Sequence, residues 1–147
     1  MATRFIRSEC KQRIVELISA NTDADVLRNE PKNWMQNGVF LADTIGTVSY
    51  PAQAAGYIPR DDEFSIVVVC VRNEPGDTAE QAEEACQEYG EAVMAAVTNS
   101  TGPTLDDLDG VFDATVSNVD GPDSVPTAEG FMAVMTVTID VHTRITL

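Results

Sequence analysis

Apolar residues recur at helical spacing in two segments of the chain. From Thr3 to Ser19 they fall three or four residues apart, the period of an amphipathic helix. The segment from Thr78 to Val97 has the same period, and Asp77 with Glu80 three residues later matches a capping box at its start. The sequence therefore predicts two helices with one buried face each. The positions expected to be buried on the second helix are Ala82, Ala85, Cys86, Tyr89, Val93, Met94 and Val97.

Other segments carry strand patterns. Phe64–Val71 is apolar on both faces, as expected of a central strand. Val111–Val119 alternates, and the long segment Phe131–Ile145 places apolar residues on one side and mixed residues on the other. Short strands are expected at Asp25–Leu27 and at Val39–Ala42, the latter extending toward Val48.

Turn-rich segments separate these elements. Ser49–Asp62 has neither period and is predicted to be a long exposed loop. Asn73–Asp77 and Asp120–Gly130 are predicted to be turns. The order helix, two short strands, long strand, helix, strand, long strand predicts a single domain over residues 1–147. The expected fold class is α+β, a two-layer sandwich in which both helices cover one face of a mostly antiparallel or mixed sheet.

Composition agrees with one soluble core. The chain has 147 residues, of which 44% are apolar, and a domain of this size buries enough surface to fold without disulfides. Its longest apolar runs fall short of the roughly 18–20 residues that a membrane span needs, and the first residues lack the apolar core of a secretory signal. The sequence disfavours membrane insertion and Sec-type export.

The charge balance is strongly acidic. Nine Lys and Arg face 24 Asp and Glu, which gives a formal net charge of −15 and a pI near 4.1. Such a chain repels phosphates, so nucleic-acid binding through a basic patch is disfavoured. The scarcity of lysine, present only as Lys11 and Lys32, is typical of proteins that work in concentrated salt. An ordinary acidic protein from a high-GC organism is the open alternative.

The residues that carry chemistry are few. Cys10, Cys70 and Cys86 lie in apolar patterns and are expected to be reduced core thiols. The only histidine, His142, lies near the end of what is expected to be an edge-like strand, without a supporting catalytic motif. The acidic loop Leu105–Gly110 does not match an EF-hand. The sequence therefore predicts no enzyme, no cofactor and no metal.

Charged stripes lie on both predicted helices. The stripe on the first helix is basic, and the stripe on the second is acidic and is expected to face water. Each stripe fits a solvated helix face, and the basic one also fits a docking surface for an acidic partner or a second copy. The residues are Arg4, Arg7 and Lys11 on the first helix and Glu80, Glu84, Glu88 and Glu91 on the second.

The order of the segments resembles a known family. A short amphipathic helix, RFIRSECKQRIVELI, precedes a Trp-containing segment, NEPKNWMQNGVFLAD, and a β-rich run, DEFSIVVVCVRNEPGD. A helix, DTAEQAEEACQEYGEAVMAAV, leads through TLDDLDGVFDATVSNV to Glu129-Gly130, which open the closing strand. This layout resembles the tail terminator (tail completion) proteins of long-tailed viruses with non-contractile tails, including the minor tail protein U type. The likeness spans nearly the whole chain, although Ser49–Asp62 is longer than the pattern needs.

The resemblance implies a structural protein of the virion, located at the tail and neck and assembled in the host cytoplasm. Six copies would form a homohexameric ring on the head-proximal end of the tail tube. The ring would stop polymerisation of the major tail tube protein and join the head–tail connector or stopper protein. Genome DNA would pass through its channel without specific binding. The acidic composition adds a virus of a salt-loving host to this expectation.

A cyclic ring needs two different complementary patches on each copy. The basic and acidic stripes are one candidate pair. The aromatic residues Trp34, Tyr50 and Tyr57 are candidate docking residues, and packing within the chain is their open alternative. Two other functions stay open: another head–tail neck or head-completion protein, and a cytosolic ferredoxin-like ligand-binding domain with a pocket.

Overall fold

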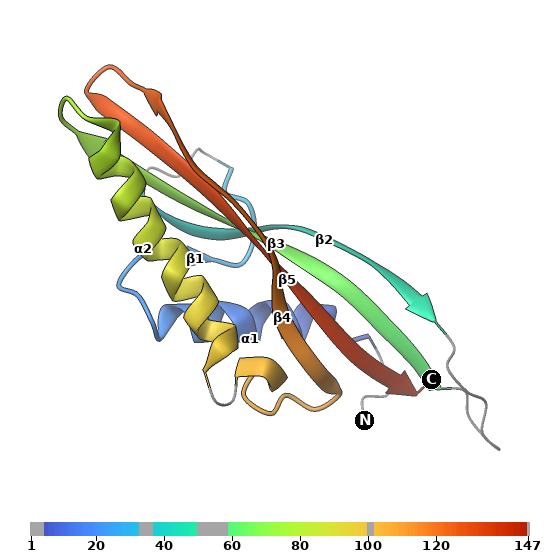
Figure 1. Cartoon of the computed structure of the whole chain (residues 1–147). Helices are drawn as coiled ribbons and strands as arrows, with labels where there is room; N and C mark the ends of the chain where they lie inside the picture. The colour runs from blue at the N-terminus through green and yellow to red at the C-terminus, as the bar shows by residue number, and fades with distance from the viewer. Residues whose placement is uncertain (1–4, 33–36, 50–58, 100–101, 147) are drawn as a thin grey trace.

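The computed structural model describes residues 5–32, 37–49, 59–99 and 102–146 (Figure 1). It contains two α-helices, one 3₁₀ turn and five strands. In chain order these are α1 (Arg7–Ser19), β1 (Val26–Leu27), β2 (Gly38–Ser49), β3 (Pro59–Pro75), α2 (Ala79–Thr98), η1 (Gly102–Thr104), β4 (Val111–Pro126) and β5 (Gly130–Thr146).

The five strands form one open sheet in the order β1-β2-β3-β5-β4. All neighbours are antiparallel except β1 and β2, which are parallel. β3 is central, as its apolar faces predicted, and it pairs with β5 over its full length. The predicted α+β class with a mixed sheet is confirmed.

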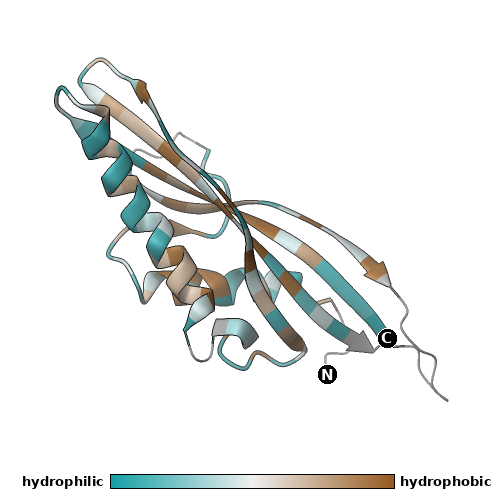
Figure 2. Ribbon diagram, in the orientation of Figure 1, coloured by the Kyte–Doolittle hydropathy of each residue, from teal (hydrophilic) through white to brown (hydrophobic). Residues whose placement is uncertain are grey.

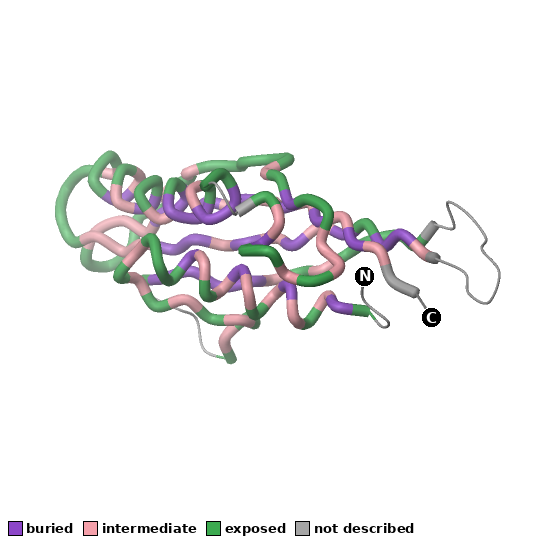
Figure 3. The backbone as a smooth tube through the Cα atoms, turned by 90° about the horizontal axis from the view of Figure 1, so that it is seen from below, coloured by how far each residue is buried: buried purple, intermediate pink, exposed green. Residues whose placement is uncertain are grey.

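Both helices lie on the same face of the sheet (Figure 1). Figure 3 shows buried positions alternating along the strands beneath them. The predicted alternation of β5 is confirmed from Ala133 to Val141, where every second side chain is buried. The cluster beneath the helices includes Cys10, Ile14, Ile18, Val39, Leu41, Phe64, Ile66, Val68, Cys70, Cys86, Val93, Val137 and Ile139.

The opposite face of the sheet is largely uncovered by the described elements. Phe40 and Val71 are buried there, outside the main cluster, whereas Ile45 is 71% exposed. At one edge, β1 pairs only with Val39 and Phe40, so the rest of β2 has no outer strand among the described residues. At the other edge, β4 is interrupted by three register shifts, which with its aspartates discourage pairing with another strand.

The strands are longer than the sequence predicted. The expected loop Ser49–Asp62 is wrong at both ends, because Ser49 belongs to β2 and Pro59–Asp62 to β3, and its middle, residues 50–58, lies outside the described residues. Asp61 and Asp62 are buried strand residues whose charges are balanced by arginines, and the apolar pattern gives no sign of this. The expected turns at 73–77 and 120–130 are likewise partly strand, since β3 runs to Pro75 and β4 to Pro126. β4 is an edge strand with mostly exposed side chains, so its pattern is polar.

The helix ends and one helix face also differ from the prediction. α1 begins at Arg7 rather than Thr3, and α2 begins at Ala79 with Thr78 as an N-cap that makes no side-chain hydrogen bond, so the predicted capping box is absent. Met94 is 37% exposed rather than buried. Gly90 lies in the helix–sheet contact instead, where a Cβ would come within 2.5 Å of Met135 Sδ.

The three thiols lie in the core as predicted. Cys10, Cys70 and Cys86 are free and buried. Burial raises the pKa of Cys10 and of Cys70 to about 12 and that of Cys86 to about 11. None of the described helices has the length and apolar character needed to cross a membrane.

Candidate interaction surfaces

Arg7 of the predicted basic stripe is engaged within the chain. Its Nε donates to Asp62 Oδ2 at 2.8 Å and its Nη2 to Asp62 Oδ1 at 2.5 Å. The Asp62 side chain is fully buried, and the Arg7 guanidinium also lies 5.2 Å from the centre of the Phe64 ring. The hydrogen bond to Asp62 raises the pKa of Arg7. Arg7 therefore joins α1 to β3 and has little capacity left for a partner.

A hollow of about 410 Å³ opens beside this pair, between α1, β1 and β2. Lys11 Nζ donates to Asn29 Oδ1 at 2.8 Å, and Arg28 Nη2 donates to the carbonyl of Ser8 at 3.2 Å and to its hydroxyl. Neutral oxygens thus hold both cations in place without cancelling their charge. We call this site the basic hollow; it is lined by Arg7, Ser8, Lys11, Arg28, Asn29 and Thr44.

α2 presents an acidic surface, as predicted. Its four predicted glutamates are all exposed, and no Lys or Arg occurs anywhere in Ala79–Thr98. Hydrophilic residues follow the outer side of this helix in Figure 2. Glu80, Glu84 and Glu88 are spaced four residues apart, so they repel one another along the helix. We call this surface the acidic ridge; it consists of Glu80, Glu84, Glu88 and Glu91.

The two charged surfaces lie over different parts of the sheet. α2 packs on β3, β4 and β5, whereas α1 contacts β1 and the side of α2. The basic hollow therefore faces the β2 edge of the sheet, and the acidic ridge stands above the strands toward the β4 edge. This separation gives one copy two unlike surfaces.

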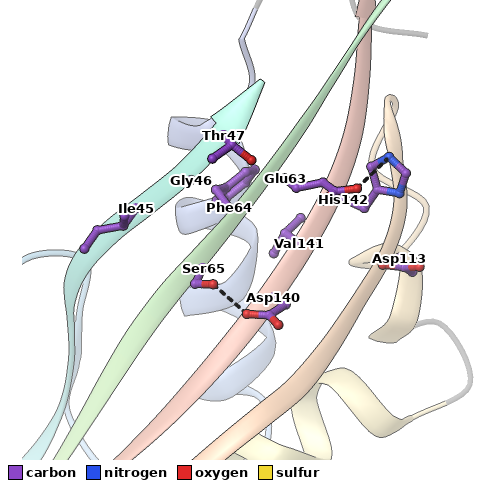
Figure 4. Close-up of a pocket in the computed structure, with 10 residues that line it drawn as sticks. All are labelled: Ile45, Gly46, Thr47, Glu63, Phe64, Ser65, Asp113, Asp140, Val141 and His142. Atoms are coloured by element: carbon purple, nitrogen blue, oxygen red, sulfur yellow. Dashed lines mark hydrogen bonds and ion pairs between the residues drawn. The ribbon is translucent and has the colours of Figure 1, made fainter. Parts of the chain in front are cut away.

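A second hollow of about 460 Å³ lies toward the end of the sheet where β2 finishes and β3 begins (Figure 4). Ser65 Oγ donates to Asp140 Oδ1 at 2.6 Å across the β3–β5 pair. Two residues further along these strands, His142 Nε2 lies 4.0 Å from Glu63 Oε1 and 3.3 Å from Asp61 Oδ2. Because the hydroxyl of Ser65 is directed to Asp140, it is not aligned for activation by His142.

Arg144 lies at the same end of the sheet and is hydrogen-bonded to Asp61. Its Nε and Nη2 donate to the two oxygens of Asp61 at 2.7 and 3.2 Å, and its guanidinium lies 5.1 Å from the centre of the Phe112 ring. The hydrogen bond from Arg144 is the main cause that lowers the pKa of Asp61. His142 packs edge-on against Phe112. It lies on β5, between β3 and β4, so the prediction of an edge-like strand is wrong.

Some candidate residues lie elsewhere. Arg4, Trp34, Tyr50 and Tyr57 are outside the described residues. Arg28 was not among the candidates, because a two-residue strand gives no pattern that would place it beside α1. Within the described ranges, no group of three or more His, Cys, Asp and Glu side chains is arranged to hold a metal ion.

No family model and no curated protein matches this sequence. Among solved structures, the chain is similar to one in the structure described as "Virion of native gene transfer agent (GTA) particle". The two share 12% identity, the match covers 92% of this chain and 91% of that chain, and the TM-score is 0.48.

Proposed function

We propose that this chain is a structural protein of a virion and, more specifically, a ring-forming tail terminator. In this proposal six copies close into a ring on the head-proximal end of the tail tube. The ring ends polymerisation of the major tail tube protein and presents the surface that meets the head–tail connector or stopper. The proposal places the protein in the neck of the particle and gives it no enzymatic activity.

The observation that carries the proposal is the asymmetry of the single copy. Among the described residues the sheet ends in two unlike edges, β1 with β2 on one side and β4 on the other, and the basic hollow and the acidic ridge lie over different parts of it. A closed ring is built from heterologous contacts, in which each copy offers two different patches. The element order along the chain, with one helix before β1 and β2 and the second between β3 and β4, also agrees with the layout that suggested the family.

Net charge supports a role around DNA without binding to it. A channel formed by copies that each carry −15 repels phosphates, so DNA would move through it without adhering. The partners proposed for the ring are the tail tube protein on one side and the connector on the other.

The test is the mass of the purified full chain by light scattering at low and at multi-molar salt, followed by negative-stain imaging of any large species. A ring of six copies with a central hole is the expected result. A protein that stays monomeric at every salt concentration contradicts ring formation by the chain itself.

A second candidate is a small-ligand-binding domain, which the hollow at Ser65, Asp140 and His142 favours. Its volume of about 460 Å³ falls within the range of ligand pockets. The polar groups there already contact one another, which weighs against a free binding site. A stable dimer that binds a small molecule would select this candidate over the ring.

Another neck or head-completion protein would also form rings, and only its position in the particle, seen by imaging of assembled virions, separates it from a terminator.

A further inference from the structure

We propose that the basic hollow binds the acidic ridge of a second copy of this chain. The proposal rests on the ring described above and names the contact that closes it: carboxylates of Glu84 and Glu88 from one copy meet Lys11 and Arg28 of the next. Arg7, although it lines the hollow, serves to hold Asp62 and leaves recognition to its neighbours.

The hollow has the donors that a carboxylate needs. Lys11 and Arg28 are cationic side chains, and each is oriented by a neutral oxygen, Asn29 Oδ1 and Ser8 O respectively. Thr44 lines the same hollow, but its hydroxyl oxygen is buried and has no hydrogen-bond partner among the described residues. Because that oxygen has almost no accessible surface, a carboxylate entering the hollow would accept from the two cations.

Three other described arginines hydrogen-bond or pair within the chain. Arg13 donates to the carbonyls of Leu105 and Asp106, Arg72 pairs with Glu74, and Arg144 pairs with Asp61. Each of these holds two parts of the same chain together. Lys11 and Arg28 are thus cations that neighbour each other, line a hollow and hydrogen-bond to neutral oxygens in the described structure.

The acidic ridge supplies the complementary surface. Its glutamates are exposed on consecutive turns of a helix without a single cation, so they gain from a partner that carries cations. The ridge is straight, and Glu80 to Glu91 span about 16 Å at 1.5 Å per residue. Because ridge and hollow lie over different parts of the sheet, one copy can use both at once.

Nucleic acid is the competing anion for the hollow. Two neighbouring cations could contact a phosphate, but the rest of the surface belongs to a chain of net charge −15. A DNA backbone would meet those carboxylates along with the hollow, whereas a projecting helix ridge meets mainly the hollow. The structure therefore favours a second copy, and DNA binding becomes an outcome of the test.

The test uses two double variants of the full chain. One carries Lys11→Glu with Arg28→Glu, and the other carries Glu84→Lys with Glu88→Lys. Each alone places like charges at the contact, and we expect it to raise the concentration needed for assembly by at least about tenfold. An equimolar mixture should assemble again, because alternating copies restore opposite charges at every contact and six copies allow strict alternation. Light scattering and negative-stain imaging report both results.

Lys32→Glu is the matched control for the single variant Lys11→Glu, since Lys32 is an exposed cation that does not line the hollow and both substitutions make the net charge more negative by the same two units. Its assembly should follow the unmodified chain more closely than that of Lys11→Glu. Circular dichroism confirms that each variant is folded.

If the unmodified chain forms rings and the double variants also form them, the proposed contact is wrong while the ring stands. The same holds if the double variants do not assemble and their mixture does not recover assembly. If the unmodified chain forms no ring, both proposals fail. Binding of a duplex DNA oligonucleotide that is lost with Lys11→Glu and Arg28→Glu would also overturn the contact in favour of phosphate.

Discussion

The Arg7 guanidinium covers the carboxylate of Asp62 with two parallel hydrogen bonds, and the Asp62 side chain has no exposed surface. Removing the arginine leaves a buried charge without its partner, which is costlier than losing the attraction alone. We expect Arg7→Met to lower the free energy of unfolding by about 3 kcal/mol, the lower end of the usual range because the arginine is partly exposed. Urea denaturation of the variant measures this change.

Two further variants make that measurement specific. Lys11→Met removes a cation of the same helix whose partner is neutral, so its effect should stay within about 0.5 kcal/mol. Adding Asp62→Asn to Arg7→Met removes the uncompensated charge and should recover part of the loss. Equal stabilities of Arg7→Met with and without Asp62→Asn would show that the buried charge is not the cause.

The pair of Asp61 with Arg144 makes the free energy of unfolding depend on pH in the acidic range. The pKa of Asp61 is lower in the folded chain than in the unfolded chain, chiefly because Arg144 donates to the carboxylate. Its contribution to stability is therefore complete above the unfolded value of about 3.9 and is lost as the pH falls through the folded value. We expect the gap in urea midpoint between the unmodified chain and Asp61→Asn to be widest near neutral pH and to close below about pH 4.

Asp113 provides the comparison for this measurement. It is an exposed carboxylate that lines the hollow containing His142, and it lies outside the pair of Asp61 with Arg144. Asp113→Asn should leave the acidic part of the pH curve close to that of the unmodified chain. A gap for Asp61→Asn that stays constant down to pH 2 would contradict the assignment.

The cysteines should be chemically silent in the folded protein. Their pKa values of about 11 to 12 keep the thiols protonated at pH 8, and burial blocks access to them. We expect fewer than one thiol per chain to react with a disulfide reagent at pH 8 and all three to react in denaturant. Rapid reaction of one thiol in the native protein would mean that its part of the core opens.

The sequence was most informative where apolar residues repeat. The period of α1 and α2, the two apolar faces of β3 and the alternation of β5 each led to the right element, because burial on a regular backbone leaves that pattern. The pattern failed where polar residues are buried by pairing. Asp61 and Asp62 belong to a strand because Arg144 and Arg7 balance their charges, and these partners lie 83 and 55 residues away along the chain.

For a similar reason, the sequence predicts the acidic ridge in full but only part of the basic hollow. The acidic ridge follows from helical spacing alone, since its glutamates need only to face water. The basic hollow requires Arg28 to come beside Lys11, which depends on the parallel pairing of β1 with β2. The spacing of residues along the chain does not predict the pairing of β1 with β2. Nor does local spacing reveal that Arg7 is engaged by a strand residue.

Salt should favour assembly of the ring. Six copies carry a formal charge of 6 × −15, or −90, so bringing them together at low salt works against a large repulsion. At 1 M salt the Debye length is about 3 Å, and repulsion between charges farther apart than this is mostly screened. The proposed contact between the acidic ridge and the basic hollow would join opposite charges at close range inside a hollow, so we expect salt to weaken it less than the repulsion between whole copies.

Because salt screens the repulsion between copies more than it weakens the proposed contact, we expect assembly to respond to salt differently from ordinary salt-bridged complexes. The fraction of ring by light scattering should rise from low salt to multi-molar potassium chloride, and the rise should be steeper with Lys32→Glu, which makes every copy more acidic. The variant Glu84→Lys with Glu88→Lys has less net repulsion, yet it should assemble poorly at every salt concentration because its contact is lost. Rings that form at low salt and dissolve as salt is added would mean that ion pairs, and not repulsion between whole copies, dominate the energy of assembly.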